Sequence, residues 1–129
     1  MKLKQLVPML NVSDIQASLR FYCDALGFEM ISPEDALEEW HWCLIRQGHV
    51  ELMLSQTGAG PRLDVGVNPH RDANWPAIFY FYPDDVVALY QSLQDADYQV
   101  STLEVTFYGM NEFSMQDPDG HLLSFGQEQ

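Results

Sequence analysis

A strand–helix–strand pattern occurs twice in this chain, and it limits the fold more than any other feature of the sequence. In the first copy, residues 6–12 alternate in polarity as a half-buried strand does, and residues 15–26 carry apolar side chains at three- and four-residue spacing. Asp14 offers an acceptor to the free amides of a helix start, and Gly27 permits the left-handed conformation that ends a helix. An extended apolar run at 28–31 then predicts a second strand.

The second copy begins about seventy positions later and is less regular. Residues 77–82 (AIFYFY) predict a strand, Pro83 and Asp84 predict the start of a helix, and residues 98–100 predict a return to extended chain. Two more strands are predicted after each copy, at 42–46 and 49–55 and then at 112–116 and 122–126. The sequence therefore predicts an α+β fold of two βαβββ modules.

The length of the chain suits one domain. A chain of 129 residues buries about two thirds of its unfolded surface, enough for a core without disulfides or structural metal. We expect a single domain over residues 1–129, with module one at about 1–56, a linker at about 57–76 and module two at about 77–129. The linker is long for a simple connection, so we expect either a flexible crossover or a lid over a pocket. His70 within it is expected to be solvated.

Composition limits the partners and the compartment. The chain has 19 acidic and 6 basic residues, and this net charge of −13 repels nucleic acid and anionic membranes and attracts cations. Acidity can serve solubility alone or can steer a cationic ligand, and the count does not separate the two. Cys23 and Cys43 lack paired spacing and are expected to be small buried residues in a reducing cytoplasm. Pro8 and Asn11 interrupt the N-terminal apolar run, which predicts neither a signal peptide nor a membrane span.

Two local patterns in module one predict side-chain positions. Trp40 and Trp42 are expected to open a strand and to point to the same side of the sheet, either in the core or at the rim of a cavity. Gln47 and Gly48 predict a tight hairpin, after which Glu51 and Met53 lie on one face of the next strand.

Four segments along the chain carry a family resemblance. They occur in the order LVPMLNVSDIQASLRFYCDALGF, QGHVELML, YFYPDDVVALYQSL and YGMNEFSMQDPDGHLLSFGQ. This order resembles the vicinal oxygen chelate superfamily, which includes glyoxalase I, extradiol dioxygenases, fosfomycin resistance proteins and bleomycin resistance proteins. The resemblance covers nearly the whole chain and implies two modules whose curved sheets form a cup, commonly completed by a second subunit in a homodimer.

The enzymes of that superfamily hold a divalent metal with four side chains inside the cup. The resemblance places these positions at Val7, Glu51, Ile78 and Ser124. Of the four, Glu51 alone suits a divalent metal, because valine and isoleucine offer no donor atom. We therefore expect no metal and no cofactor, as in the bleomycin resistance branch, whose members bind the drug without transforming it.

The resulting hypothesis is a cytoplasmic protein that binds a small molecule. It would sequester a cationic or aromatic ligand, such as a bleomycin-like antibiotic, in a cup at a homodimer interface. Strand alternation and the resemblance nominate as ligand-binding residues Asn11, Glu51, Met53, Tyr80 and Tyr82, with Trp40, Trp42, Tyr108, Met110 and Phe113 at the rim. For each aromatic residue, core packing is the alternative.

The alternative hypothesis is an enzyme of the same superfamily. A carboxylate at Glu51 among apolar side chains would be poorly solvated, which would raise its pKa and suit it to act as a general base. This predicts a cofactorless isomerase, or an atypical metal-dependent isomerase, lyase or dioxygenase with substitute ligands such as His41 and His49. Binding of another small metabolite or peptide antibiotic would show the same sequence features as binding of bleomycin.

Overall fold

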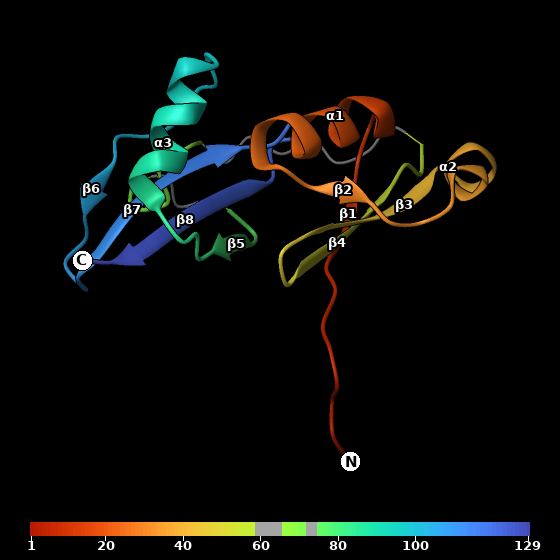
Figure 1. Ribbon diagram of the computed structural model, residues 1–129, viewed down its shortest axis with the longest axis horizontal. Coiled ribbons are helices and arrows are strands. Elements are labelled where there is room, and N and C mark those ends of the chain that lie inside the picture. The colour runs from red at the N-terminus through yellow and green to blue at the C-terminus, as the bar shows by residue number, and fades with distance from the viewer. Residues whose placement is uncertain (59–65, 72–74) are drawn as a thin grey trace. The chain divides into compact units, whose positions relative to one another are not determined.

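A computed structural model of the chain describes residues 1–58, 66–71 and 75–129. The chain forms two compact units, Met1–Pro61 and Arg62–Gln129. Each unit contains a four-stranded sheet (Figure 1).

The first unit holds the first predicted module. Its elements are β1 (Met9–Asn11), α1 (Ile15–Leu26), β2 (Glu29–Met30), α2 (Glu34–Trp40), β3 (Trp42–Gln47) and β4 (Val50–Ser55). The strand order is β1-β4-β3-β2, with β1 parallel to β4 and the other pairs antiparallel. Leu52 and Leu54 of β4 are buried on one face, where α1 packs with its buried Tyr22. Asp14 caps α1 by accepting from the amide of Ala17 at 3.1 Å.

The second unit repeats this topology. Its elements are β5 (Ile78–Phe81), α3 (Val86–Asp95), β6 (Glu104–Val105), β7 (Met110–Gln116) and β8 (Leu122–Glu128). The strand order β5-β8-β7-β6 matches that of the first unit, again with the first strand parallel to the last. The predicted α+β fold of two βαβββ modules is thus confirmed, with α2 as an addition to the first.

An aromatic core lies between α3 and the sheet of the second unit. Phe125 of β8 stacks on Phe81 of β5 and on Phe113 of β7, with ring centroids 5.4 and 5.0 Å apart. Tyr90 of α3 meets Phe113 edge to face at 5.2 Å. Since side chains alternate along a strand, the neighbours of these phenylalanines point to the opposite face, away from α3.

The prediction for Trp40 and Trp42 is wrong. Residues 34–40 (EDALEEW) form helix α2, whose first turn carries Glu34 and Asp35 where the helix dipole favours negative charge. Trp40 ends this helix with 68% of its surface exposed, and His41 follows in a left-handed conformation with φ of 53°. The two tryptophans therefore do not share a strand.

Two boundaries in the second unit also differ from prediction. The helix begins at Val86 rather than at Asp84, because Asp85 is the residue that caps it, accepting from the amide of Ala88 at 3.0 Å. The extended run expected at 98–100 is not a strand, and β6 lies at Glu104–Val105 instead. Asp97 follows α3 in a left-handed conformation (φ of 64°). The backbone N–H of Ser101 donates to the carbonyl oxygen of Ser114 in β7 at 2.8 Å, ahead of the β6–β7 pairing.

Within the described residues, no helix has the length and the apolar character needed to cross a membrane.

Candidate functional site

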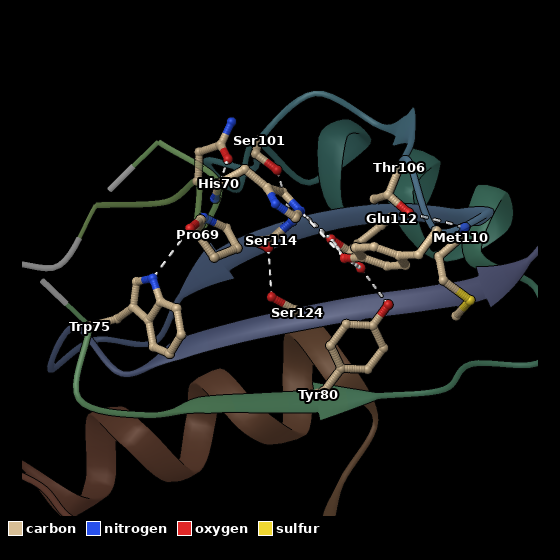
Figure 2. A network of polar contacts seen from close by, with 12 residues as sticks. Pro69, His70, Trp75, Tyr80, Ser101, Thr106, Met110, Glu112, Ser114 and Ser124 are labelled. Atoms are coloured by element: carbon tan, nitrogen blue, oxygen red, sulfur yellow. Dashed lines mark hydrogen bonds and ion pairs between the residues drawn. The ribbon is translucent and has the colours of Figure 1, made fainter. Parts of the chain in front are cut away.

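Glu112 of β7 is a buried carboxylate, 4% exposed, at the centre of a hydrogen-bond cluster in the second unit. The Tyr80 hydroxyl donates to Oε2 at 2.5 Å. The Tyr108 hydroxyl lies 2.7 Å from Oε2 and 2.9 Å from Oε1. Nε2 of His70 lies 2.9 Å from Oε1. Figure 2 shows Tyr80 and His70 reaching Glu112 from different directions, and these four residues are called the Glu112 cluster below.

The register of the sheet explains how these residues meet. Tyr80 of β5 lies beside Ser124 of β8, while Glu112 of β7 lies on the far side of β8 beside Gly126. The Tyr80 side chain must therefore cross β8 to reach the carboxylate. A Cβ atom at position 126 would clash with the hydroxyl and the ring of Tyr80. Glycine at this position leaves the path open.

Burial and hydrogen bonding set the charge states of the cluster. Burial raises the pKa of the Glu112 carboxyl, but hydrogen bonds from Tyr80, His70 and Tyr108 stabilise the carboxylate and bring its pKa below the ordinary value. Burial and the neighbouring carboxylate raise the pKa of Tyr108 to about 12, and the same causes raise the pKa of Tyr80. At neutral pH the carboxylate is therefore ionised, and both tyrosines are neutral donors.

A cavity of about 470 Å³ lies beside the cluster, lined by Tyr80, Tyr82, Tyr108, Met110 and Glu128. Tyr80 and Tyr82 project from the same side of the chain, with ring centroids 5.1 Å apart. Cavities of roughly 300–1,000 Å³ with apolar and aromatic walls and a few polar groups are typical of small-molecule sites. The structure thus brings four of the nominated residues together, namely Tyr80, Tyr82, Tyr108 and Met110.

The segment Gly66–Arg71 is tied to this sheet. Gln116 of β7 donates to the carbonyl oxygen of Gly66 at 2.9 Å, and the indole of Trp75 donates to that of Pro69 at 3.3 Å. The side chain of His70 keeps 42% exposure while its Nε2 meets Glu112. The expectation that His70 is simply solvated is therefore wrong. Residues 59–65 and 72–74 of the predicted lid lie outside the described residues.

The prediction of Phe113 as a residue at the rim of the cavity is wrong. It is 1% exposed and belongs to the aromatic core beneath α3, so it lies on the face opposite to Met110 and Glu112. Glu112 itself was not nominated. The signal was available in the alternation of β7, because a cavity-facing Met110 places Glu112, two residues on, on the same face.

Glu51 in the first unit differs from the prediction as well. Arg46 lies opposite Glu51 in the β3–β4 pair and donates to Oε2 from Nε at 2.8 Å and from Nη2 at 2.6 Å. Gln5 donates to Oε1 at 2.9 Å. The hydrogen bonds from Arg46 lower the pKa of Glu51, so the predicted raised pKa is wrong.

The other nominated residues of the first unit are Asn11, Met53 and Trp42. Met53 pairs with Met9 and Asn11 with Ser55, which puts Asn11 and Met53 on the same face as Glu51. Trp42 also pairs with Ser55 and is half-buried on this face. A role of these residues in ligand binding stays a prediction.

The four positions that the resemblance assigns to a metal lie in different settings. Ser124 bonds to Ser114 through their hydroxyls at 2.7 Å, and Glu51 is paired with Arg46. Within residues 1–58, 66–71 and 75–129, no three His, Cys, Asp or Glu side chains are grouped so that they could hold a metal ion.

The fold thus consists of two βαβββ modules of matching topology, one of them with an aromatic cavity beside a buried carboxylate. Residues 2–125 match the model of the Glyoxalase/Bleomycin resistance protein/Dioxygenase superfamily, and the chain belongs to this superfamily. The predicted superfamily is confirmed.

Similar proteins point to one branch of the superfamily. The chain is 26% identical over 130 residues to the bleomycin resistance proteins of Geobacillus stearothermophilus and of Staphylococcus aureus, with 96% of each chain covered. Among solved structures, a bleomycin-binding protein in complex with bleomycin has a TM-score of 0.66 at 22% identity, covering 98% of this chain and 100% of that one. An antibiotic-binding protein from a Streptomyces species has a TM-score of 0.72 at 20% identity, covering 100% and 99%. The predicted resemblance to bleomycin resistance proteins is confirmed, and the structural neighbours confirm the fold.

Proposed function

We propose that this protein binds a small cationic aromatic molecule, such as a bleomycin-like antibiotic, and sequesters it without transforming it. The observation that carries the proposal is the cavity of about 470 Å³, whose wall consists of three tyrosines, a methionine and a carboxylate. The net charge of −13 supports it, because such a field raises the local concentration of cations. The similarity to bleomycin resistance proteins supports bleomycin as the first ligand to test.

Magnitudes indicate what kind of ligand fits. A cation over an aromatic ring gains about 0.5–2 kcal/mol, depending on how well it is desolvated. Micromolar binding needs about 8 kcal/mol. Three rings therefore do not suffice through cation–π contacts alone, and burial of apolar ligand surface must supply much of the rest. A ligand that joins an apolar aromatic part to its positive charge would meet both needs.

The resemblance to the superfamily also motivates a proposal about assembly. We propose that the protein acts as a cytoplasmic homodimer in which a second copy completes the binding cup. Size-exclusion chromatography with light scattering tests this part separately. A single-chain mass at all accessible concentrations would contradict it.

Titration with copper-free and with copper-loaded bleomycin tests the binding proposal. We expect saturable binding by calorimetry, and mass spectrometry should recover the drug unchanged. Replacement of Tyr82 by Ala should weaken binding, whereas replacement of the exposed Leu6, outside the cavity, should not. Absence of heat with both forms of the drug at high micromolar concentration would reject the antibiotic, and a modified drug would reject sequestration.

The hypothesis that Glu51 acts as a general base depended on a raised pKa. Arg46 lowers the pKa of Glu51 instead, and a carboxylate held in an ion pair is a weaker base than a free one.

A further inference from the structure

We infer that two carboxylates, Glu128 in the cavity wall and Glu112 behind it, have separate tasks. Glu112 is a positioning residue that holds Tyr80 and Tyr108 as a fixed wall, and Glu128 is the group that meets the positive charge of a ligand. The second task rests on the proposed function, whereas the first can be tested without any ligand.

The acceptor sites of Glu112 are already occupied. A carboxylate has about four lone-pair positions, and Glu112 uses its two oxygens for Tyr80, Tyr108 and His70, all within 2.9 Å. With 4% exposure it has almost no surface left for another partner. A ligand cation could reach this carboxylate only by displacing one of the three donors. Glu112 is therefore unsuited as the counter-charge of a ligand.

The same hydrogen bonds fix the wall of the cavity. Tyr80 and Tyr108 line the cavity with their side chains while their hydroxyls are held by Glu112. Tyr80 reaches the carboxylate across Gly126, where a larger residue would push it aside. The position of the two rings thus depends on residues that the ligand does not touch, which is preorganisation of a binding site.

Glu128 has the properties that Glu112 lacks. It lies near the end of β8 opposite Met110, lines the cavity and is exposed. Within the part of the chain that the structure describes, its carboxylate has no hydrogen bond or ion pair. A carboxylate at the edge of an aromatic cavity can pair with a ligand cation while flat rings take up the aromatic part.

Two tricyclic probes separate the two tasks. Proflavine is a planar cation, and acridine has the same ring frame but is uncharged at mildly alkaline pH. We expect Glu128→Gln to weaken proflavine binding about tenfold and to reduce its salt dependence, with acridine affinity unchanged. We expect Glu112→Gln to weaken both probes by a similar factor, because it loosens the rings. Equal effects of Glu128→Gln on the two probes, or a selective loss of proflavine in Glu112→Gln, would overturn the inference.

A ligand-free measurement tests the positioning task. Alkaline titration of the tyrosines, followed by phenolate absorbance, should show two high-pH transitions in the wild type that move to lower pH in Glu112→Gln. The exposed Glu104→Gln is the matched control and should leave the titration unchanged. Gly126→Ala keeps the carboxylate but displaces Tyr80, and it should move one of the two transitions. An unchanged titration in Glu112→Gln overturns the positioning role. If the wild type bound neither probe, the proposed function and the pairing of Glu128 with a ligand cation would both be rejected.

Discussion

Each unit of this protein carries a glutamate on the sheet face that its helix leaves uncovered, and the two glutamates have opposite surroundings. Glu51 in the first unit is paired with Arg46 and hydrogen-bonded by Gln5 near the surface. Glu112 in the second unit is buried among the neutral hydroxyls of Tyr80 and Tyr108, with His70 at its open side. Similar topology thus surrounds one carboxylate with an arginine and the other with two neutral hydroxyls and a histidine.

The difference shows that the partners of a carboxylate determine how much of its charge remains unpaired. An arginine cancels the charge of Glu51 locally, and water and salt screen what remains. The hydroxyls of Tyr80 and Tyr108 stabilise the carboxylate of Glu112 without cancelling its charge, and His70 contributes a further hydrogen bond and an electrostatic interaction. Both arrangements lower the pKa of the glutamate. The direction of the shift alone would not have distinguished them.

Removal of the Glu112 carboxylate is expected to have the largest effect. Glu112→Ala leaves two hydroxyls without their acceptor and opens a gap in the sheet face, which should lower the free energy of unfolding by about 3 kcal/mol. Urea unfolding monitored by circular dichroism measures this. A loss no larger than that of Glu51→Ala in the same assay would show that the two carboxylates are equivalent.

Gly126→Ala is expected to have the next largest effect. The added methyl group meets the hydroxyl end of the Tyr80 side chain rather than backbone, so the chain should fold with the tyrosine displaced, at a cost of about 1–2 kcal/mol. The double variant Gly126→Ala with Tyr80→Leu removes the ring that clashes. In urea unfolding, the double variant should have the same free energy of unfolding as Tyr80→Leu alone. If the losses of the two single variants added up instead, the side chain of Tyr80 would not lie over Gly126.

Acid should reveal the charge of Glu112. Its pKa in the folded chain is below the ordinary glutamate value of about 4.3, so the folded state binds fewer protons than the unfolded state in that range. The stabilisation is fully present above the unfolded pKa and is lost as the pH falls through the folded pKa. In Glu112→Gln, the free energy of unfolding should therefore fall less steeply as the pH is lowered, as measured by urea unfolding at a series of pH values. An unchanged slope at low pH would contradict the lowered pKa.

Salt separates the two glutamates in this experiment. The contribution of the exposed Glu51 pair should shrink in high salt, whereas that of the buried Glu112 should persist. In high salt, the fall of the free energy of unfolding at low pH that remains in the wild type should be lost in Glu112→Gln. If it were lost in Glu51→Gln instead, the roles of the two glutamates would be reversed.

Local patterns were sufficient to predict most of the architecture. The first strand–helix–strand segment, the cap at Asp14 and the strands β7 and β8 depend on neighbours close in sequence, and the structure follows them. The helix at 34–40 was missed because Trp40 was assigned to the start of the following strand. Phe81, the neighbour of Tyr80 on β5, stacks on Phe125 in the core, as alternation along a strand requires.

The candidate site depended on contacts that local patterns do not contain. His70 lies 42 positions before Glu112 in the sequence, and only the course of the segment Gly66–Arg71 brings the two together. Tyr80 reaches Glu112 only because β8 lies between β5 and β7 and has a glycine at the crossing. Strand order and the position of a loop are tertiary features, so sequence reasoning nominated the tyrosines and missed the carboxylate that organises them.

The hairpin before Glu51 is shifted by one residue from its predicted position, and the shift changes the residue opposite Glu51. A loop at Gln47 and Gly48 would have placed Leu44 opposite Glu51, in an apolar setting. The loop instead consists of Gly48 and His49, with Gln47 paired to Val50, and this register puts Arg46 opposite Glu51.

Replacement of Glu51 is expected to have the smallest effect, which completes the comparison. Glu51→Gln keeps the shape of the side chain and removes an exposed ion pair, and pairs of this kind contribute little because solvent and salt screen them. We expect unfolding in urea to be nearly unchanged at moderate salt, with the proflavine affinity of the second unit unaffected apart from the general loss of one negative charge. Arg46→Gln is the matched variant, and it should leave stability similarly unchanged. If Glu51→Gln instead abolished ligand binding while Glu128→Gln did not, the ligand would be held by the first unit, and the division between a surface pair and a buried organising carboxylate would have to be reversed.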